Sequence, residues 1–165
     1  MSAESSVPRI WVISDTHLTN SKLLPAEFTR KIDRKDVVLH LGDIITFEVW
    51  EFLTTLCRVE AVSGNCDMPD VRRRLKPKKV LELGGFKIGM THGHGGVSEA
   101  LKSMRQEYEN KVDVAMFGHT HIPCNMQQGD TLFFNPGSLK NARIGHNSYG
   151  VLHLDSRPWA EVIEI

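Results

Sequence analysis

The sequence has no long apolar run, no surplus of charge of either sign and few cysteines. Its 165 residues contain no stretch of the roughly 20 apolar residues that span a bilayer, so we expect no membrane segment. Twenty basic and twenty acidic residues cancel, and a chain without a basic surplus is not expected to bind nucleic acid stably. Three cysteines cannot form a closed disulfide set, which favours a reducing, cytoplasmic location.

Other common features are also missing. Residues 1–6 are small and polar and lack the basic start and apolar stretch of a signal peptide, so we expect none. There is no internal repeat, linker or low-complexity segment. The length suits one compact domain and is too short for two, so we expect a single domain over residues 1–165.

The first half of the chain alternates strand-like and helix-like patterns. Apolar runs at 10–14, 37–41 and 59–62 predict buried strands. Residues 23–32 and 47–57 predict helices between them, the second with Thr46 as its N-cap. Such alternation predicts a mostly parallel, covered sheet.

The second half is richer in hairpin signals. Turn residues at 84–85, 129–130 and 155–158 separate paired strand-like runs and predict three hairpins. A helix is expected over 97–108 and a strand over 114–117. The whole sequence therefore predicts an α/β fold of two packed sheets with helices outside them.

Five of the predicted strands run directly into residues that bind metals. These segments are Asp15-Thr16-His17, Leu41-Gly42-Asp43, Gly64-Asn65-Cys66-Asp67, Thr91-His92-Gly93-His94 and Gly118-His119-Thr120-His121. Ligand-rich strand ends drawn from across the chain predict a metal site at one edge of a sheet.

Each residue type suits part of such a site. Asp15 and His17 are two positions apart and would point the same way on extended backbone. Asp43 has two carboxylate oxygens and could bridge two cations. Asn65 offers a neutral amide oxygen, and the imidazoles of His119 and His121 could each reach a different ion.

His92 and His94 compete for one role. We prefer His92 as the ligand because it lies nearer the rigid strand. His94 precedes Gly95-Gly96 and a helix start whose free amide groups favour an anion. We therefore expect His94 to contact phosphoryl oxygens.

Ordinary alternatives exist for most of these residues. Asp15 and Asp43 could cap turns, and single histidines such as His17 are often simply exposed. The occurrence of all five segments in one chain favours a metal site over these ordinary roles. His40 is the exception: its strand parity is opposite to that of Asp43, so we interpret it as a core histidine.

The motif order D-x-H, G-D, G-N-x-[DE], G-H and G-H-x-H resembles the calcineurin-like metallophosphoesterases. The match runs from Asp15 to His121. The small size and the Asn135-Pro136-Gly137-Ser138 segment are similar to the YfcE-like phosphodiesterases of bacteria and archaea. The resemblance implies a four-layer α/β/β/α sandwich of two mixed sheets flanked by helices.

The resemblance also implies two metal sites. One ion would take Asp15, His17, Asp43 and His121, and the other Asp43, Asn65, His92 and His119, with Asp43 shared. Mixed imidazole and oxygen ligands fit Mn, Fe, Zn, Co or Ni, and the resemblance favours two Mn²⁺ ions. The catalytic residues expected are Asp43, Asn65 and His94.

Two such ions, about 3.5–4 Å apart, would activate a bridging water, and the resulting hydroxide would attack phosphorus in line with the leaving oxygen. No side-chain nucleophile is needed, which agrees with the absence of a G-x-S-x-G motif. The expected function is therefore a phosphodiesterase acting on a small diester.

Cys66 is a departure from larger relatives, which have histidine at that place. We favour a plain buried thiol over a catalytic one, and a thiol is a weak proton donor. Good leaving groups should therefore be preferred. The basic run from Arg72 to Lys79 could steer anionic substrates, although we favour a solvated loop.

Two other functions remain open. A scaffold similar to the retromer subunit of this fold would bind proteins and tolerate lost ligands, whereas this chain retains the full set. A phosphomonoesterase or protein phosphatase is disfavoured by the short chain and by Cys66. Exposed hairpin edges could also pair two copies into a homo-oligomer.

Overall fold

The computed structural model describes residues 8–165. Two mixed sheets of five strands each form its centre. The first sheet has the order β10-β9-β1-β2-β3, with β1 (Ile10–Ile13), β2 (Val37–His40), β3 (Arg58–Ala61), β9 (Ser148–Leu154) and β10 (Pro158–Glu164). The second has the order β4-β5-β6-β8-β7, with β4 (Lys78–Leu83), β5 (Phe86–Thr91), β6 (Val114–Met116), β7 (Cys124–Gln128) and β8 (Thr131–Asn135).

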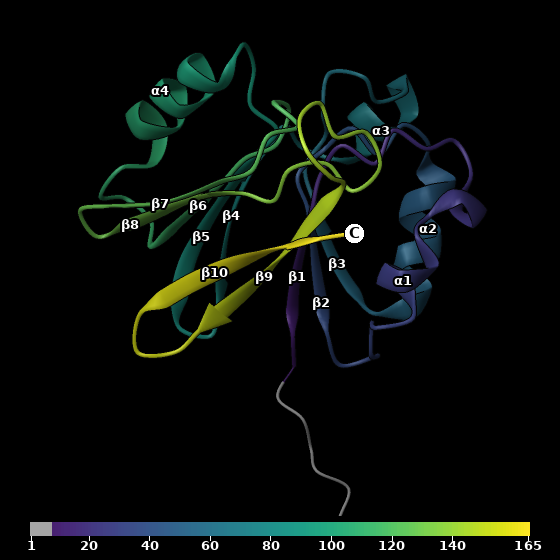
Figure 1. The fold of residues 1–165 in the computed structure, drawn as a ribbon, viewed down its shortest axis with the longest axis horizontal. Coiled ribbons are helices and arrows are strands. Elements are labelled where there is room, and N and C mark those ends of the chain that lie inside the picture. Colours follow the sequence, from purple (N-terminus) through teal and green to yellow (C-terminus); the bar gives the residue numbers. More distant parts are fainter. Residues whose placement is uncertain (1–7) are drawn as a thin grey trace, which may run out of the picture.

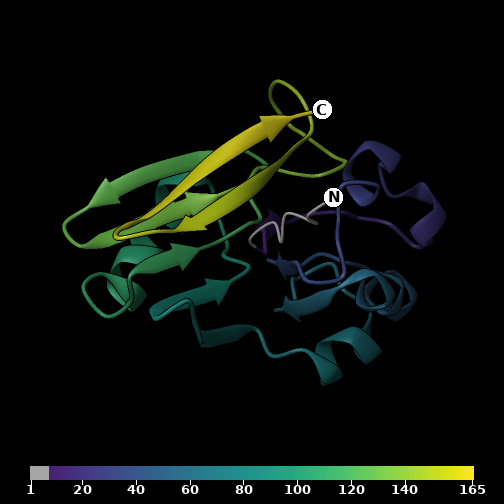
Figure 2. The ribbon, with the colours of Figure 1, turned by 90° about the horizontal axis from the view of Figure 1, so that it is seen from below.

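Helices lie on the outer faces of both sheets (Figure 1). The helical segments are η1, a 3-10 turn (Ser21–Leu23), α1 (Ala26–Thr29), α2 (Phe47–Leu56), α3 (Pro69–Arg74) and α4 (Val97–Tyr108). The purple-to-blue first half, with α1 and α2, lies to one side, and the green-to-yellow strands lie to the other (Figure 2). The expected four-layer α/β/β/α sandwich is confirmed.

Successive side chains of a strand point to opposite faces of its sheet, and they contribute to three separate apolar cores. Val12 of β1 and Met90 of β5 belong to the core between the two sheets. Ile13, one residue after Val12, faces the other way and packs with Phe28 of α1. Phe133 of β8 similarly joins a third core beneath α4. Period-two patterning thus assigns successive residues of a strand to different layers.

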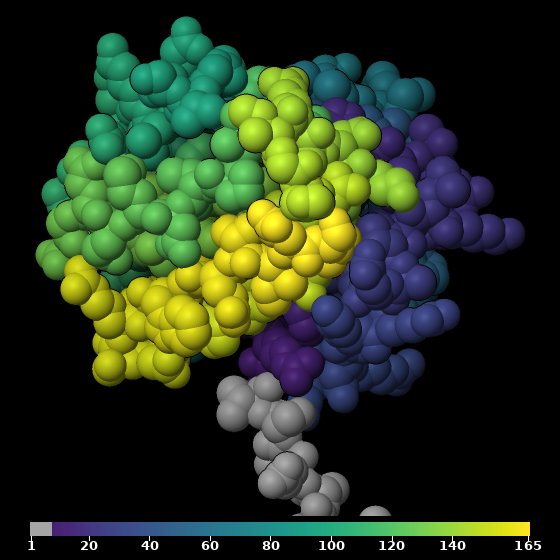
Figure 3. All heavy atoms as spheres, viewed as in Figure 1, coloured from purple at the N-terminus to yellow at the C-terminus, as the bar shows by residue number. Residues whose placement is uncertain are grey.

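The C-terminal hairpin lies against the second sheet. The Asn125 side chain of β7 donates a hydrogen bond to the Ala160 carbonyl of β10, at 2.7 Å. In the space-filling view the yellow β9–β10 hairpin lies beside the green β7–β8 region (Figure 3). Because β9 also pairs with β1, this hairpin helps to fix the two sheets relative to each other.

The expected helix over residues 23–32 is wrong. The structure has only the 3-10 turn and the four residues of α1 there. Leu24 is extended, with ψ of 138°, and Pro25 has ψ of 119°. A proline lacks an N–H and disfavours helical backbone in the residue before it, so the chain cannot pass through Leu24-Pro25 as a helix.

The loop expected over the basic run is also wrong in part. Residues 72–74 complete α3, in which Pro69 is the first residue, a position that tolerates proline well. The remaining strands and helices agree with the expected ranges to within one residue, the usual uncertainty of element ends. Within the described residues, no helix is long and apolar enough to span a membrane. The absence of a signal peptide concerns residues 1–6, which lie outside that range.

Candidate metal centre

The parallel strands of the two sheets end at one common edge. Strands β1, β2 and β3 run parallel, as do β5, β6 and β8. Ser138, beyond β8, donates a hydrogen bond from Oγ to the Asp15 carbonyl at 2.7 Å, and Gly118 N–H donates to the His92 carbonyl at 2.9 Å. These bonds join the strand ends of both sheets around one cluster of side chains.

The proposed ligands leave their strands through left-handed backbone turns. The φ angles are 52° at Asp15, 49° at His17, 55° at Asp43, 67° at His119 and 58° at His121. Asp15 and His17 therefore do not lie on the extended backbone that we expected, although both side chains face the same cluster. A left-handed conformation is uncommon outside glycine, and it redirects each side chain toward the cluster.

The first group of ligand atoms surrounds Asp15. Its Oδ1 lies 3.2 Å from His121 Nε2 and 3.7 Å from His17 Nε2. The two imidazole Nε2 atoms are themselves 3.2 Å apart. The ligand atoms of Asp15, His17 and His121 all lie within 4.8 Å of one another, the separation expected of groups that share an ion.

The second group adjoins the first through Asp43. The Asp43 Oδ2 lies 3.4 Å from His17 Nε2 and 3.2 Å from His92 Nε2. His119 Nδ1 lies 3.3 Å from His92 Nε2 and 3.0 Å from Asn65 Oδ1. Asp43 therefore stands between the two groups, where a bridging ligand would have to stand.

Hydrogen bonds outside the cluster orient these side chains. His92 Nδ1 is 2.7 Å from the Leu41 carbonyl, and His121 Nδ1 contacts the Asn141 carbonyl. Each imidazole thus keeps Nε2 for the cluster, as a metal-bound histidine does when its other ring nitrogen bonds a carbonyl. Asp43 Oδ1 accepts the Cys66 N–H at 2.8 Å, which leaves Oδ2 facing the histidines.

Hydrogen bonds to one of its two carboxylate oxygens also orient the Asp15 side chain. Its Oδ2 accepts Ser14 Oγ–H at 2.6 Å and the His119 N–H at 2.9 Å. Its Oδ1 is buried and has no hydrogen-bond partner among the described residues. An unpaired buried carboxylate oxygen is costly unless a cation neutralises it. Together with the imidazoles around it, this oxygen fits a divalent ion.

Glycines allow the strand ends to approach closely. A Cβ on Gly64 would lie 2.2 Å from Asp43 Oδ1, and one on Gly118 would lie 1.9 Å from Ser14 Oγ. Gly42, with φ of 98°, approaches the His92 ring in the same way. Any side chain at these positions would displace a proposed ligand or its partner.

The charges of the cluster shift its pKa values in opposite directions. Burial raises the pKa of Asp15, but the adjacent imidazoles of His121 and His17 outweigh it and lower the pKa well below its usual range. The nearby carboxylate of Asp15 raises the pKa of His121. Burial lowers the pKa of His92, yet Asp43 and Asp15 outweigh it and raise the pKa. The two carboxylates therefore favour positive charge next to them, either on a protonated imidazole or on a bound metal ion.

His40 lies in the core, as expected. It is fully buried and contacts the Thr16 hydroxyl through Nε2 at 3.2 Å. Its Nδ1 accepts the Gly42 N–H at 3.2 Å. Burial lowers the pKa of His40 to about 3, so the ring is neutral.

The structure does not bring His94 into the cluster. Its side chain is exposed and, within residues 8–165, makes no hydrogen bond, ion pair or ring contact. Cys66 is also exposed, which contradicts the expectation of a buried thiol. Its position after Asn65, at the rim of the cluster, leaves the thiol open to solvent. Desolvation, followed by the charge of Asp43, raises its pKa, so the thiol stays protonated.

Sequence reasoning missed two contributors. Asp67, assigned no role, is buried and accepts the backbone N–H groups of Ile45 and Gly64, both at 2.7 Å. It thereby holds the loop that carries Asn65. Arg72, interpreted as part of a solvated loop, lines a cavity with Asn65 and His92. Its place in a basic run was the only signal in the sequence.

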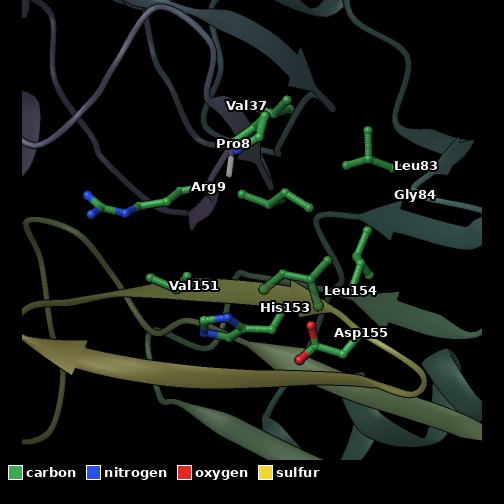
Figure 4. Close-up of a pocket in the computed structure, with 11 residues that line it drawn as sticks. Pro8, Arg9, Val37, Leu83, Gly84, Val151, His153, Leu154 and Asp155 are labelled. Atoms are coloured by element: carbon green, nitrogen blue, oxygen red, sulfur yellow. The ribbon is translucent and has the colours of Figure 1, made fainter. Parts of the chain in front are cut away.

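An apolar pocket lies at the opposite end of the sheets (Figure 4). It has a volume of about 410 Å³ and is lined by Pro8, Ile10 and Val37, where β1 and β2 begin, and by Leu83 and Leu154. The proposed ligands follow the other ends of those strands. The pocket is therefore separate from the cluster.

Comparisons with known proteins identify relatives of this chain. The model of the calcineurin-like phosphoesterase superfamily domain matches residues 9–157. A probable metallophosphoesterase of Methanocaldococcus jannaschii is 35% identical over 159 residues, which cover 94% of this chain and 81% of that protein. The phosphodiesterase YfcE of Escherichia coli K12 is 36% identical over 104 residues, or 59% of this chain and 54% of that protein.

A solved structure shares the fold. Wild-type Vps29 of Entamoeba histolytica, crystallised in complex with Zn²⁺, has a TM-score of 0.70 at 27% identity and covers 94% of this chain and 98% of its own. The matched range of the family model includes every strand end that contributes to the cluster.

Proposed function

The chain belongs to the calcineurin-like phosphoesterase superfamily, and on that premise we propose that it is a phosphodiesterase that uses two divalent metal ions. The observation that carries the proposal is the buried, unpartnered Oδ1 of Asp15, with the Nε2 atoms of His17 and His121 around it. A buried carboxylate oxygen with imidazole nitrogens around it is the environment of a bound cation.

The residues would divide between two ions. Asp15, His17 and His121 would hold one ion, and Asn65, His92 and His119 the other, with Asp43 shared between them. When bound, such ions would activate water for in-line attack on phosphorus and neutralise phosphoryl charge. Mn²⁺ is our first choice, and Fe, Zn, Co and Ni fit the same donors.

The protein's own residues would position the substrate. Hydrogen bonds to the Leu41 and Asn141 carbonyls fix the rings of His92 and His121, so the cluster is organised before substrate binds. His94 is exposed and unpaired on its loop, and we propose that it contacts phosphoryl oxygens when substrate is present.

Diesters are favoured over monoesters because of Cys66. Desolvation raises the pKa of this thiol, and a thiol is a weak donor, so it would protonate a poor leaving group inefficiently. The substitution Cys66→His should therefore raise the turnover of alkyl monoesters, while the metal content is retained. Unchanged monoester turnover in a fully metal-loaded variant would show that the thiol does not set this preference.

A matrix of metals and substrates tests the main proposal. The metal-free protein is loaded separately with Mn²⁺, Fe²⁺, Zn²⁺, Co²⁺ or Ni²⁺ and assayed with bis(p-nitrophenyl) phosphate, p-nitrophenyl phosphate, cyclic nucleotides and phospholipid diesters. We expect two ions per chain and the fastest turnover on diesters. Fewer than one ion after loading would contradict the proposal.

A scaffold role is the second candidate, favoured by the structural similarity to Vps29. Its signature in the same matrix would be retained ions without turnover of any ester. The full set of convergent ligands around Asp15 and Asp43 argues for the enzyme, because a scaffold would tolerate the loss of ligands.

A further inference from the structure

A second feature of the site lies beside Asn65 and His92. Both residues line a cavity of about 250 Å³, together with Arg72 of α3 and Thr91 of β5. The full lining is Ser63, Gly64, Asn65, Arg72, Pro77, Thr91, His92 and Gly93, and none of these eight described residues is acidic or is Phe, Tyr or Trp. A substrate held at the cluster would extend one substituent into a space whose only fixed charge is a guanidinium.

The backbone that carries Arg72 is firmly held. Val71, its neighbour, is fully buried, and the Arg72 N–H donates to the Met68 carbonyl at 3.1 Å. The Ser63 N–H donates to the Lys76 carbonyl at 3.0 Å. The segment from 63 to 76 therefore closes on itself, which fixes the base of the Arg72 side chain relative to the loop of Asn65.

Across residues 8–165, Arg72 lacks the kind of partner that holds three other members of the basic run. Arg74 lies over the Phe47 ring, 4.0 Å from its centroid, and Lys78 pairs with Glu107 at 2.8 Å. Lys79 forms an ion pair with Glu60. Within the described residues, the Arg72 guanidinium has no hydrogen bond, ion pair or ring partner. It is free to bind a ligand in the cavity.

We propose that Arg72 is a specificity residue that binds an anionic substituent, a carboxylate or a phosphate, on the alcohol portion of the diester. The inference rests on the proposed function and names the class of substrate. The guanidinium fork matches the oxygens of either anion. A nucleobase is disfavoured because the described lining offers no Phe, Tyr or Trp face for stacking, and its one aromatic ring, that of His92, belongs to a proposed metal ligand.

Four p-nitrophenyl diesters that differ only in their second alcohol test the proposal. The second group is ethyl, 2-carboxyethyl, 2-phosphonoethyl or choline, so the leaving group is constant while the charge changes. In Arg72→Ala, the ratio of kcat/KM for the anionic diesters to that for the ethyl diester should fall about tenfold, the effect of losing one charged hydrogen bond. The carboxylate and phosphonate substrates show which anion is preferred.

Charge reversal and a neighbouring control sharpen the result. Arg72→Glu should shift the preference toward the choline diester. Arg73→Ala removes the adjacent exposed cation, which does not line the cavity, and should leave the ratio unchanged. An unchanged ratio in Arg72→Ala, or an equal fall in Arg73→Ala, would overturn the proposal, since the charge would then act on the shared phosphoryl group or over the whole surface.

A binding measurement separates this inference from the proposed function. Calorimetry with Mn²⁺-loaded protein compares phosphoglycolate, which carries a second anion, with methyl phosphate, which does not. Arg72→Ala should weaken phosphoglycolate binding selectively, and equal weakening of both ligands would contradict the assignment. If the wild-type protein hydrolyses none of the diesters, the proposed function fails, and the binding measurement still decides the role of Arg72.

Discussion

Left-handed backbone at non-glycine residues is the feature of single residues that most shapes this site. Asp15, His17, Asp43, His119 and His121 share it, and each such conformation costs about 1–3 kcal/mol. We attribute this strained backbone at five polar residues of one edge to function, because such strain clusters at active sites and ligand clamps.

The shared position of Asp43 makes its charge the most sensitive single feature of the cluster. We expect Asp43→Asn to lose both ions and most activity, because a neutral amide is a weaker ligand for two cations. Elemental analysis of the metal-loaded variant measures the loss. Retention of two ions would show that Asp43 does not bridge.

The two histidines of the 91–94 segment should behave differently. His94→Ala should leave metal stoichiometry intact and weaken binding of inorganic phosphate, because His94 lies outside the cluster. His92→Ala should instead lose one ion, since His92 Nε2 faces Asp43 at 3.2 Å. Metal analysis and phosphate titration of both variants decide the assignment, and one ion lost from His94→Ala would reverse it.

At the scale of elements, one carboxylate joins the first two strands. Asp36, just before β2, accepts the Arg9 N–H at 2.9 Å and the Trp11 indole N–H of β1 at 2.8 Å. Its other partner is the Asp33 N–H, at 2.9 Å. Three donors from two segments thus converge on one side chain.

Removing the charge of Asp36 should destabilise the fold. Asp36→Asn is expected to lower the free energy of unfolding by about 1–3 kcal/mol, the worth of hydrogen bonds to a charged group. Urea unfolding at pH 7 measures it. Metal stoichiometry should be unchanged, because Asp36 lies at the opposite end of β2 from Asp43.

The stability difference between wild type and Asp36→Asn should depend on pH. Burial raises the pKa of Asp36, but its backbone hydrogen bonds outweigh burial and lower the pKa. The stabilisation is therefore complete above the ordinary carboxyl pKa of about 3.9 and is lost as the pH falls through the lower folded-state value. The difference between wild type and Asp36→Asn should shrink in that acidic range, and a constant difference would exclude the charge as its origin.

At the scale of the whole molecule, the proposed ions connect the two sheets. Ligands follow β1, β2 and β3 of one sheet and β5 and β6 of the other. Bound metal should therefore stabilise the entire fold, by about 2.7 kcal/mol for each site when free metal is one hundred times Kd. Thermal unfolding with and without Mn²⁺ measures the shift, and Asp43→Asn, lacking the bridge, is the matched control.

That stabilisation should depend on pH. Metal binds neutral imidazole, and the pKa values of His92 and His121 are raised by their carboxylate partners despite burial. Protons therefore compete with metal at pH values above the ordinary histidine pKa of about 6.5. The metal-induced shift in Tm should be smaller at pH 6 than at pH 8. Equal shifts at both values would show that these histidines are not ligands.

The sequence by itself determined the strands, most helices and the chemistry of the cluster. Period-two alternation in segments such as β1 reflects burial against different layers, so local pattern was sufficient. Carboxylate, amide and imidazole groups directly after strands were visible as residue types. The helix expected over 23–32 treated Pro25 as tolerated in its first turn and overlooked the restriction that proline places on Leu24, which is also a local rule.

Only the tertiary structure decided how those groups meet. His17 and His121 lie 104 positions apart and come within 3.2 Å because two sheets pack with their strand ends at one edge. The left-handed turns that aim the ligands, the exposure of His94 and the place of Arg72 beside Asn65 all depend on that packing. Side-chain direction after a strand is set by backbone contacts between distant segments, and no local pattern encodes those contacts.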